Sequence, residues 1–195
     1  MIVLASQSPR RRALMQQMGL QFAVMAEDVD ETMDPALPIE QEIIRVSRSK
    51  ALAVQRSVSP EDVIVAADTM VCVDGRRLGK PRDGADAARM LRLLSGRAHT
   101  VVTGLSVVRG ARFESCAVTT DIHFRLLSEA EIAAYLATGE PLDKAGAYGI
   151  QGRAAIFVDR LDGDYYNVMG LPVCTLTQLL RRFGVQVLGE TACDL

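Results

Sequence analysis

The sequence predicts an α/β fold built on a mixed sheet. Short apolar runs such as those at 2–5 and 63–67 indicate buried strands, and the stretch 38–56 spaces its apolar residues for one face of a helix. Strands and helices alternate along part of the chain, with hairpin signals between them, which favours a sheet with both parallel and antiparallel strands. The 195 residues are enough for one sizeable core, and we expect one domain over residues 1–195.

In the N-terminal half, residues with strong positional preferences mark the element ends. Ser8 is a suitable N-cap, Pro9 suits the first helical position and Gly19 suits a helix C-terminus. Asp74-Gly75 is typical of a tight hairpin turn. The elements predicted here are strands at 2–5, 22–25, 63–67 and 70–73, helices at 9–18, 38–56 and 83–94, and an acidic loop after the second strand.

The C-terminal half continues the alternation. A turn at Arg109-Gly110 joins two strand-like stretches into a long hairpin, and Ser128 with Glu131 forms a capping box. The elements predicted here are strands at 99–108, 112–124 and 154–161, a helix from 128 to about 138, a glycine-rich loop at 143–152 and a last helix from 172 to about 183.

Composition excludes several classes of function. The net charge of −2 argues against non-specific binding to nucleic acid, which depends on an excess of basic residues. The sequence contains no apolar run long enough to span a membrane, and we expect no signal peptide. The four cysteines are widely spaced, so we interpret them as reduced core thiols of a cytoplasmic protein: Cys72, Cys116, Cys174 and Cys193.

Three consecutive arginines follow the first predicted helix start. The helix dipole disfavours cations there by about 0.3–1 kcal/mol each. A hydrogen bond to a charged group is worth about 1.5–3 kcal/mol, so a bound polyanion would outweigh that penalty. If Leu14 and Met18 form the buried stripe, Arg10 points to the interior, whereas Arg12 is solvated. A solvated arginine cluster is the alternative, and the dipole penalty favours a phosphate site.

Two further charged residues stand in apolar surroundings. Asp68, with Thr69 beside it, closes the apolar run at 63–67, and carboxylates at strand ends commonly line the crevice of an α/β sheet. A solvated turn aspartate fits the same pattern. Lys50 occupies an apolar stripe of its predicted helix, so its ammonium either extends to the rim or reaches into a cleft.

The remaining candidates lie in loops. Lys80 in GKPRD does not belong to a phosphate-binding P-loop, since no Ser or Thr follows it. Glycines around Lys144 and Gln151 either let the backbone approach a ligand or form a flexible loop. The acidic cluster at 28–31 is either solvated or a source of magnesium ligands. Together these basic groups and carboxylates suit a metal-bound polyphosphate.

Several motifs, in order over almost the whole chain, resemble one family. They are LASQSPRRRALMQQMG, VDE at 29–31, SKALAV, AADTMV, LGKPRD, AARMLRLLSGRAHTVVTG, YLATGEPLDKAGAYGIQG and GDYYNVMGLP. The family is Maf, whose members are linked to septum formation and act as nucleoside triphosphate pyrophosphatases. The resemblance implies an elongated, two-lobed α/β fold with a central cleft, similar to that of the enzymes that remove inosine triphosphate. The form of DKAGAYGIQG resembles the subfamily that acts on dTTP and UTP.

The resemblance also assigns roles to residues. Asp68 matches the catalytic aspartate, and Arg10, Thr69 and Gln151 match positions linked to substrate choice. Glu31 and Asp68 are the expected ligands of a divalent cation, Mg²⁺ or Mn²⁺. The other expected substrate-binding positions are Ser6, Ser8, Arg11, Lys50, Lys80 and Lys144.

The expected activity is hydrolysis of pyrimidine nucleoside triphosphates to the monophosphate and pyrophosphate. The expected partner is a small nucleotide, with no nucleic acid and no membrane, and the family implies a homodimer. Two alternatives remain open: a nucleotide-binding regulator of cell division without turnover, and a nucleotidyltransferase.

Overall fold

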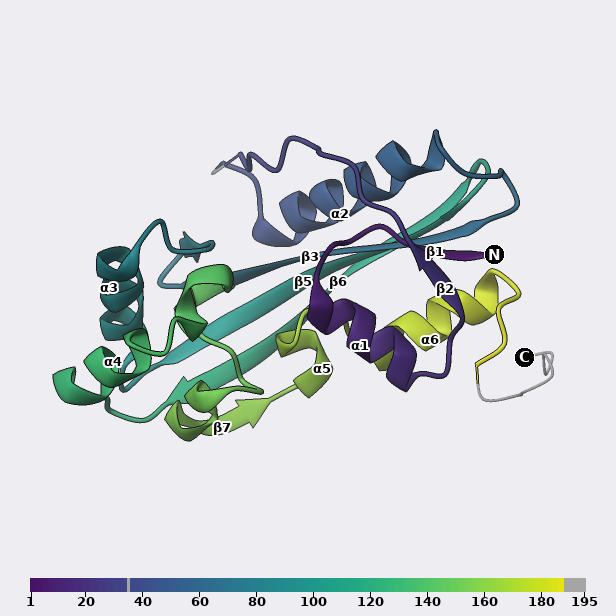
Figure 1. Cartoon of the computed structure of the whole chain (residues 1–195). Helices are drawn as coiled ribbons and strands as arrows, with labels where there is room; N and C mark the ends of the chain where they lie inside the picture. Colours follow the sequence, from purple (N-terminus) through teal and green to yellow (C-terminus); the bar gives the residue numbers. More distant parts are fainter. Residues whose placement is uncertain (35, 188–195) are drawn as a thin grey trace. The chain divides into compact units, whose positions relative to one another are not determined.

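The computed structural model describes residues 1–34 and 36–187 and confirms the mixed α/β fold (Figure 1). The strands are β1 (Ile2–Leu4), β2 (Phe22–Val24), β3 (Val63–Val73), β4 (Arg76–Leu78), β5 (Ala98–Arg109), β6 (Arg112–Phe124) and β7 (Val158–Asp162). The α-helices are α1 (Pro9–Gln17), α2 (Ile39–Gln55), α3 (Gly84–Leu94), α4 (Glu129–Leu136), α5 (Tyr165–Val168) and α6 (Val173–Arg182). Short 3₁₀ helices are η1 (Glu140–Asp143), η2 (Ala145–Ala147) and η3 (Arg153–Phe157).

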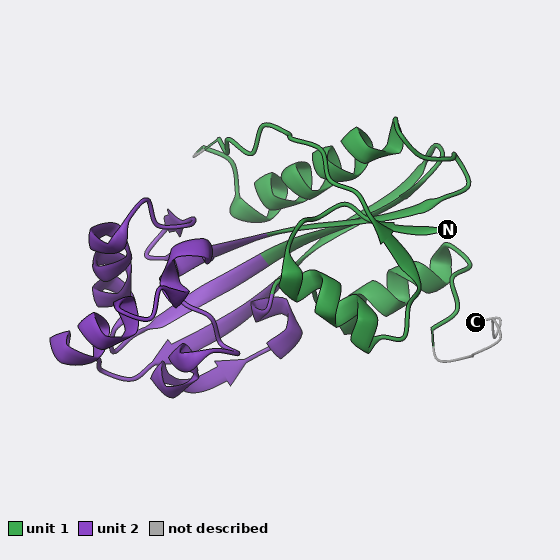
Figure 2. Cartoon of the chain, in the orientation of Figure 1, with its two compact units in different colours: residues 1–68, 103–118, 170–195 green, residues 69–102, 119–169 purple. Residues whose placement is uncertain are grey.

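Within these residues the strands form one sheet of order β2-β1-β3-β5-β6-β7, with β4 paired to β3. β1 runs parallel to β2 and β3, whereas the β3–β4 and β6–β7 pairs are antiparallel. The chain divides into two compact units (Figure 2), of which unit 1 comprises residues 1–68, 103–118 and 170–195 and unit 2 comprises 69–102 and 119–169. β3, β5 and β6 contribute residues to both units.

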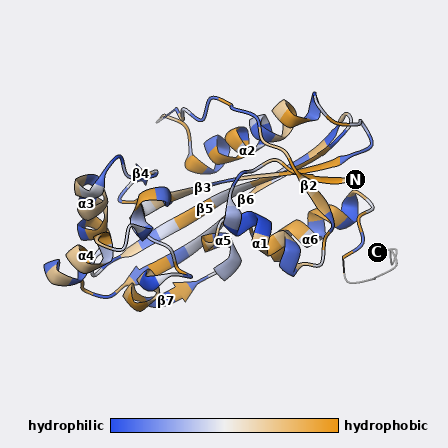
Figure 3. Cartoon of the chain, viewed as in Figure 1, coloured by the Kyte–Doolittle hydropathy of each residue, from blue (hydrophilic) through white to orange (hydrophobic). Residues whose placement is uncertain are grey.

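In unit 1, helices cover both faces of the sheet: α2 lies on one face, and α1 and α6 lie on the other (Figure 1). Val3 and Ile64 belong to a buried cluster with Val54 of α2. Leu4 and Val65, which point to the opposite face because side chains alternate along a strand, are also fully buried. These strands are therefore hydrophobic on both faces (Figure 3), as parallel strands between helices must be.

In unit 2, α3 packs against α4 and η2. Unit 2 also contains a group of rings in edge-to-face contact, with centroids 4.8 to 6.0 Å apart, a geometry that the ring quadrupoles favour. The rings belong to His99, Phe124, Tyr135, Tyr148 and Phe157.

The prediction of separate strands at 63–67 and 70–73 was wrong, because β3 runs unbroken from Val63 to Val73. Asp68 and Thr69 therefore lie inside a strand rather than at its end. They fall between the stretch that pairs with β1, through Val65, and the stretch that pairs with β4, from Val71. The sheet thus offers both polar side chains from a rigid element.

Two larger differences from the prediction lie in the C-terminal half, whereas most other boundaries agree within one or two residues. The first part of the strand expected at 154–161 belongs to η3, and β7 begins only at Val158. The short helix α5 was not predicted. It starts at Asp164, whose carboxylate accepts hydrogen bonds from the N–H groups of Tyr166 and Asn167.

The cysteines are less buried than expected. Cys72 and Cys116 are half-buried and Cys174 is exposed, so the prediction of core thiols was wrong for Cys174; Cys193 lies outside the described residues. Throughout the ranges 1–34 and 36–187, every helix is too short or too polar to cross a membrane.

Candidate functional site

The start of α1 is hydrophilic (Figure 3) and is built as the sequence predicts. Ser8 is the N-cap, its side chain accepts a hydrogen bond from the N–H of Arg11 at 3.5 Å, and Pro9 follows at the first helical position. The N–H of Ser8 donates in turn to the Oγ of Ser6 at 3.3 Å. Two serines therefore fix the loop that leads from β1 into α1.

Arg11, rather than Arg10, is the arginine that points to the interior. The buried residues of α1 are Leu14 and Met15, not Leu14 and Met18, and Arg11 precedes them by three and four positions. The expectation for Arg10 was therefore wrong, whereas Arg12 is exposed as predicted. Arg10 itself is half-buried.

Hydrogen bonds hold the buried guanidinium of Arg11. Its Nε donates to the carbonyl oxygen of Gly170 at 2.7 Å, and its Nη1 donates to the Oγ of Ser6 at 3.1 Å. Burial lowers the pKa of Arg11, and the nearby carboxylates of Asp68 and Glu31 oppose that shift. The positive charge thus lies close to two negative ones in unit 1.

Lys50 links the two predicted metal ligands. Its Nζ lies 2.7 Å from Oδ1 of Asp68 and 2.6 Å from Oε1 of Glu31. The side chains of Lys50 and Asp68 are only 15% and 14% exposed, whereas that of Glu31 is 58% exposed. Lys50 therefore interrupts its apolar helical stripe because its ammonium reaches carboxylates inside the unit.

The carboxylates of Glu31 and Asp68 are of a type that could hold a divalent cation. They converge on one cation, the Lys50 ammonium, and carboxylate oxygens are ligands that Mg²⁺ prefers. Across the described residues, no group of three or more His, Cys, Asp or Glu side chains is placed to hold a metal. Mg²⁺ commonly takes one or two carboxylates and completes its shell with phosphate oxygens and water.

The predicted site residues of unit 2 lie on a strand and two loops. Thr69 is half-buried in β3, whereas Lys80 and Gln151 are exposed. The N–H of Gly146 donates to the carbonyl oxygen of Gly79 at 3.1 Å, which ties the loop that carries Lys80 to the glycine-rich segment. Unit 2 therefore presents Lys80 on a loop that its own glycine-rich segment braces.

Lys144 is engaged within its own segment. Its Nζ donates to the carbonyl oxygen of Glu140 at 2.7 Å and to the carboxylate of Asp143, and its side chain is 16% exposed. Within the glycine-rich segment one 3₁₀ helix, η2, forms, and η1 and η3 flank the segment.

Sequence reasoning missed Glu140. Its carboxylate accepts hydrogen bonds from the hydroxyl of Tyr135 at 2.9 Å and from the N–H of Arg153 at 3.0 Å. The repeated glycines after it could have indicated a close side-chain approach, because glycine is needed where a Cβ would collide.

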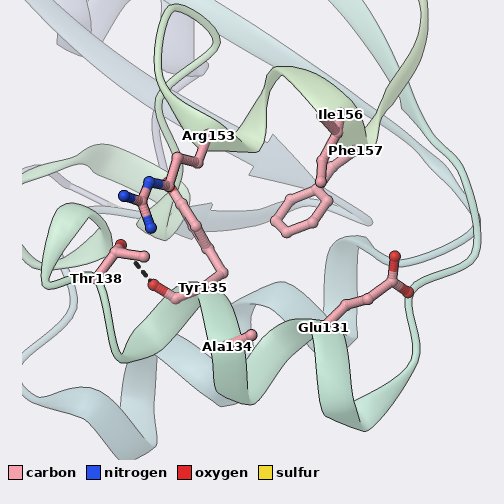
Figure 4. A pocket seen from close by; sticks show the side chains of 7 residues that line it. All are labelled: Glu131, Ala134, Tyr135, Thr138, Arg153, Ile156 and Phe157. Atoms are coloured by element: carbon pink, nitrogen blue, oxygen red, sulfur yellow. Dashed lines mark hydrogen bonds between the residues drawn. The ribbon is translucent and has the colours of Figure 1, made fainter.

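Unit 2 also contains a pocket of about 190 Å³ beside α4 (Figure 4). Its walls include none of the predicted nucleotide-binding or metal-binding residues. They are formed by Glu131, Ala134, Tyr135, Thr138, Arg153, Ile156 and Phe157.

Comparison with solved structures places the fold in a known class. The HAM1 protein of Coxiella burnetii superposes with a TM-score of 0.51 at 16% identity, and the Ham1 protein of Staphylococcus aureus with 0.50 at 14%. Each comparison covers 93% of this chain and 98% of the other. The fold is therefore the mixed α/β fold of the HAM1 proteins.

Sequence comparison identifies the family. Residues 1–183 match the family described as Maf-like protein, so this chain belongs to it. The dTTP/UTP pyrophosphatase of Vibrio cholerae is 50% identical and aligns over 93% of this chain and 97% of its own length. That of Moorella thermoacetica is 48% identical over 97% and 98%. The resemblance seen in the motifs is confirmed.

Proposed function

We propose that this protein hydrolyses pyrimidine nucleoside triphosphates, above all dTTP and UTP, to the monophosphate and pyrophosphate. Relatives that are 43–50% identical and match over nearly their whole length carry the name dTTP/UTP pyrophosphatase. The observation in this chain that carries the proposal is the Lys50 ammonium between the carboxylates of Asp68 and Glu31, next to the buried Arg11.

The cations of unit 1 bind the triphosphate in this proposal. Arg10 and the N–H groups at the start of α1 contact phosphate oxygens, while the buried guanidinium of Arg11 adds positive charge from inside the unit. Lys50 exchanges a carboxylate partner for a phosphate oxygen. These groups stabilise the negative charge that grows on pyrophosphate as the bond from the α-phosphorus to the bridging oxygen breaks.

Asp68 acts at the attacking water. This water approaches the α-phosphorus in line with the leaving pyrophosphate. Asp68 accepts a proton from that water or helps to hold the metal. Glu31 and Asp68 would hold the Mg²⁺ or Mn²⁺. The cation, when bound, neutralises phosphate charge and lowers the pKa of a bound water.

Base recognition is assigned to Gln151. Its amide offers one acceptor and two donors, which matches the O4 and N3–H of thymine and uracil. Thr69, Lys80 and Lys144 are further proposed substrate contacts. A cytoplasmic location, a homodimer and a link to septum formation also belong to the proposal, and sedimentation tests the dimer directly.

The test is pyrophosphate release from a panel of nucleoside triphosphates with Mg²⁺ or Mn²⁺, measured beside Asp68→Asn. We expect selective release from dTTP and UTP that nearly vanishes in the variant, because asparagine keeps the shape but not the charge. Binding without release from any nucleotide would support a regulator instead. Product that forms only with a second substrate would support a nucleotidyltransferase.

A further inference from the structure

The carboxylate of Glu140 joins Tyr135 of α4 to the start of η3, directly after the glycine-rich segment. Its Oε1 accepts a hydrogen bond from the Tyr135 hydroxyl at 2.9 Å, and its Oε2 accepts one from the N–H of Arg153 at 3.0 Å. The Tyr135 oxygen also accepts a hydrogen bond from the N–H of Gly149 at 3.3 Å. Gln151 lies between Gly149 and Arg153, so the backbone is held on both sides of it.

Two glycines of the segment lie directly against the side chains of this arrangement. A Cβ on Gly152 would lie 2.0 Å from Oε1 of Glu140 and 2.6 Å from its Oε2. A Cβ on Gly149 would lie 2.7 Å from Cε of Lys144. Gly152 has φ −96°, which other residues adopt, so the reason for glycine there is the carboxylate itself.

Tyr135 is suited to remain a hydrogen-bond donor. Burial raises the pKa of its hydroxyl, and the hydrogen bond to Glu140 raises it further, so the phenol keeps its proton at neutral pH. A hydrogen bond from a neutral donor to a carboxylate is stronger than one between neutral groups. The hydrogen bond from Tyr135 therefore holds the Glu140 carboxylate against α4.

We propose that Glu140, through Tyr135 and the N–H of Arg153, is a positioning residue that fixes Gln151 for base recognition and so sets selectivity among pyrimidine nucleotides. The inference rests on the proposed function. Thymine and uracil gain hydrogen bonds from a correctly placed Gln151, whereas cytosine, with a donor at position 4 and an acceptor at N3, does not match in the same way. Since a displacement of about 1 Å costs up to about 100-fold in rate, a loosened segment penalises dTTP more than dCTP.

The first test compares Glu140→Ala, Glu140→Gln and Tyr135→Phe with the wild type. We expect the ratio of kcat/KM for dTTP to that for dCTP to fall about tenfold in Glu140→Ala. Glu140→Gln keeps an acceptor for Arg153 and retains part of the ratio. The matched control is Glu129→Gln on α4, which removes an exposed ion pair with Arg92 of α3 and leaves the ratio unchanged.

Hydrogen exchange measures how firmly the backbone of the glycine-rich segment is held, and it needs no catalysis. In Glu140→Ala, peptides that cover 144–153 should exchange faster, while those of α3 should keep their protection. If selectivity or exchange in this segment matches the wild type, the inference is overturned although the proposed function stands. If the wild-type protein releases no pyrophosphate from any nucleotide, the proposed function fails and this inference fails with it.

A double mutant isolates the contact between the carboxylate and the glycine. Gly152→Ala should lower the dTTP to dCTP ratio in the wild-type background, because its Cβ displaces the carboxylate. In the Glu140→Ala background, which removes that carboxylate, the same change should have little further effect. Equal effects in both backgrounds would overturn the inference.

Discussion

The ammonium of Lys50 lies 2.7 Å from Oδ1 of Asp68, although the two residues come from a helix and a strand and are 18 positions apart. The same ammonium lies 2.6 Å from Oε1 of Glu31. A single cation therefore balances two carboxylates that are the proposed metal ligands. In the proposed function, a divalent cation at these carboxylates would compete with the Lys50 ammonium for the same negative charge, and a triphosphate would give Lys50 another partner.

Lys50→Met should raise the affinity for free Mn²⁺. Without the ammonium, Glu31 and Asp68 repel each other and attract a divalent cation more strongly. We expect Mn²⁺ binding without nucleotide, measured by calorimetry or paramagnetic resonance, to tighten at least several-fold over the wild type. Lys50→Arg, which keeps the charge, is the control. Equal binding by all three proteins would contradict competition between the metal and Lys50.

Metal removal should abolish turnover without unfolding the protein. Among residues 1–34 and 36–187, no group of three or more His, Cys, Asp or Glu side chains is placed to hold a metal. In the proposed function the cation would be held by two carboxylates together with the triphosphate. We expect EDTA to stop pyrophosphate release and excess Mg²⁺ to restore it. The thermal midpoint without nucleotide should stay within about 1 °C, because a ligand changes stability only when it binds the folded state. A large drop in the midpoint would indicate a structural metal instead.

Arg11 and Arg12 should differ sharply when each is replaced by methionine. Arg11→Met removes the donors to the Gly170 carbonyl and Ser6, and a buried acceptor left without its donor costs about 1–3 kcal/mol. Arg12 is exposed, so Arg12→Met should change the free energy of unfolding by less than about 0.5 kcal/mol. Urea denaturation of both variants measures the difference. Similar stabilities would show that Arg11 contributes little to the fold.

Local signals in the sequence predicted most elements, because they act through neighbouring residues. Ser8 and Pro9 start α1, and Ser128 with Glu131 forms the predicted capping box at α4. The turn at Asp74-Gly75 has φ of 47° and 70°, as the dipeptide indicates.

The errors came where contacts beyond a residue's immediate neighbours decide the structure. β3 continues through Asp68 because sheet pairing outweighs the polar side chain. The choice between Arg10 and Arg11 depended on whether Met15 or Met18 was buried, which tertiary packing decides. Glu140 was missed because its partners, Tyr135 and Arg153, are defined by a turn that no local pattern specifies.

Gly104 should tolerate no side chain. A Cβ there would lie 2.2 Å from the carbonyl oxygen of Ile43, so α2 packs directly on the backbone of β5. Gly104→Ala must push this helix away, and we expect a loss of about 3 kcal/mol in the free energy of unfolding. Gly84→Ala is the matched control. Nothing lies within 4 Å of a Cβ there, so the stability should stay level or rise by up to about 1 kcal/mol. Two equally stable variants would contradict the close approach.

His99 should make stability depend on pH between about 6.5 and 4. Its ring is 3% exposed and lies against Phe124 and Tyr148, and its Nε2 is 2.8 Å from the Tyr148 hydroxyl. The pKa of His99 is lowered from 6.5 to about 4, chiefly by burial and in smaller part by the nearby His123, against the opposing effect of Asp121. Below pH 6.5, His99 therefore becomes protonated in the unfolded chain but stays neutral in the folded protein until the pH nears 4. The free energy of unfolding should fall by about 3 kcal/mol as the pH drops from 6.5 to 4. At higher pH both states hold neutral His99, so this destabilisation disappears.

The variant His99→Phe separates this contribution from that of the carboxylates. Phenylalanine keeps an aromatic ring but does not titrate, so the variant should lose less stability than the wild type between pH 6.5 and 4. Glu131, whose pKa is lowered to about 2 chiefly by its hydrogen bond from Arg125, acts mainly at lower pH and is common to both proteins. Urea denaturation at half-unit pH steps gives both curves. Parallel curves would mean that His99 takes up its proton in the folded protein as readily as in the unfolded chain, and that its burial imposes no penalty on the charge.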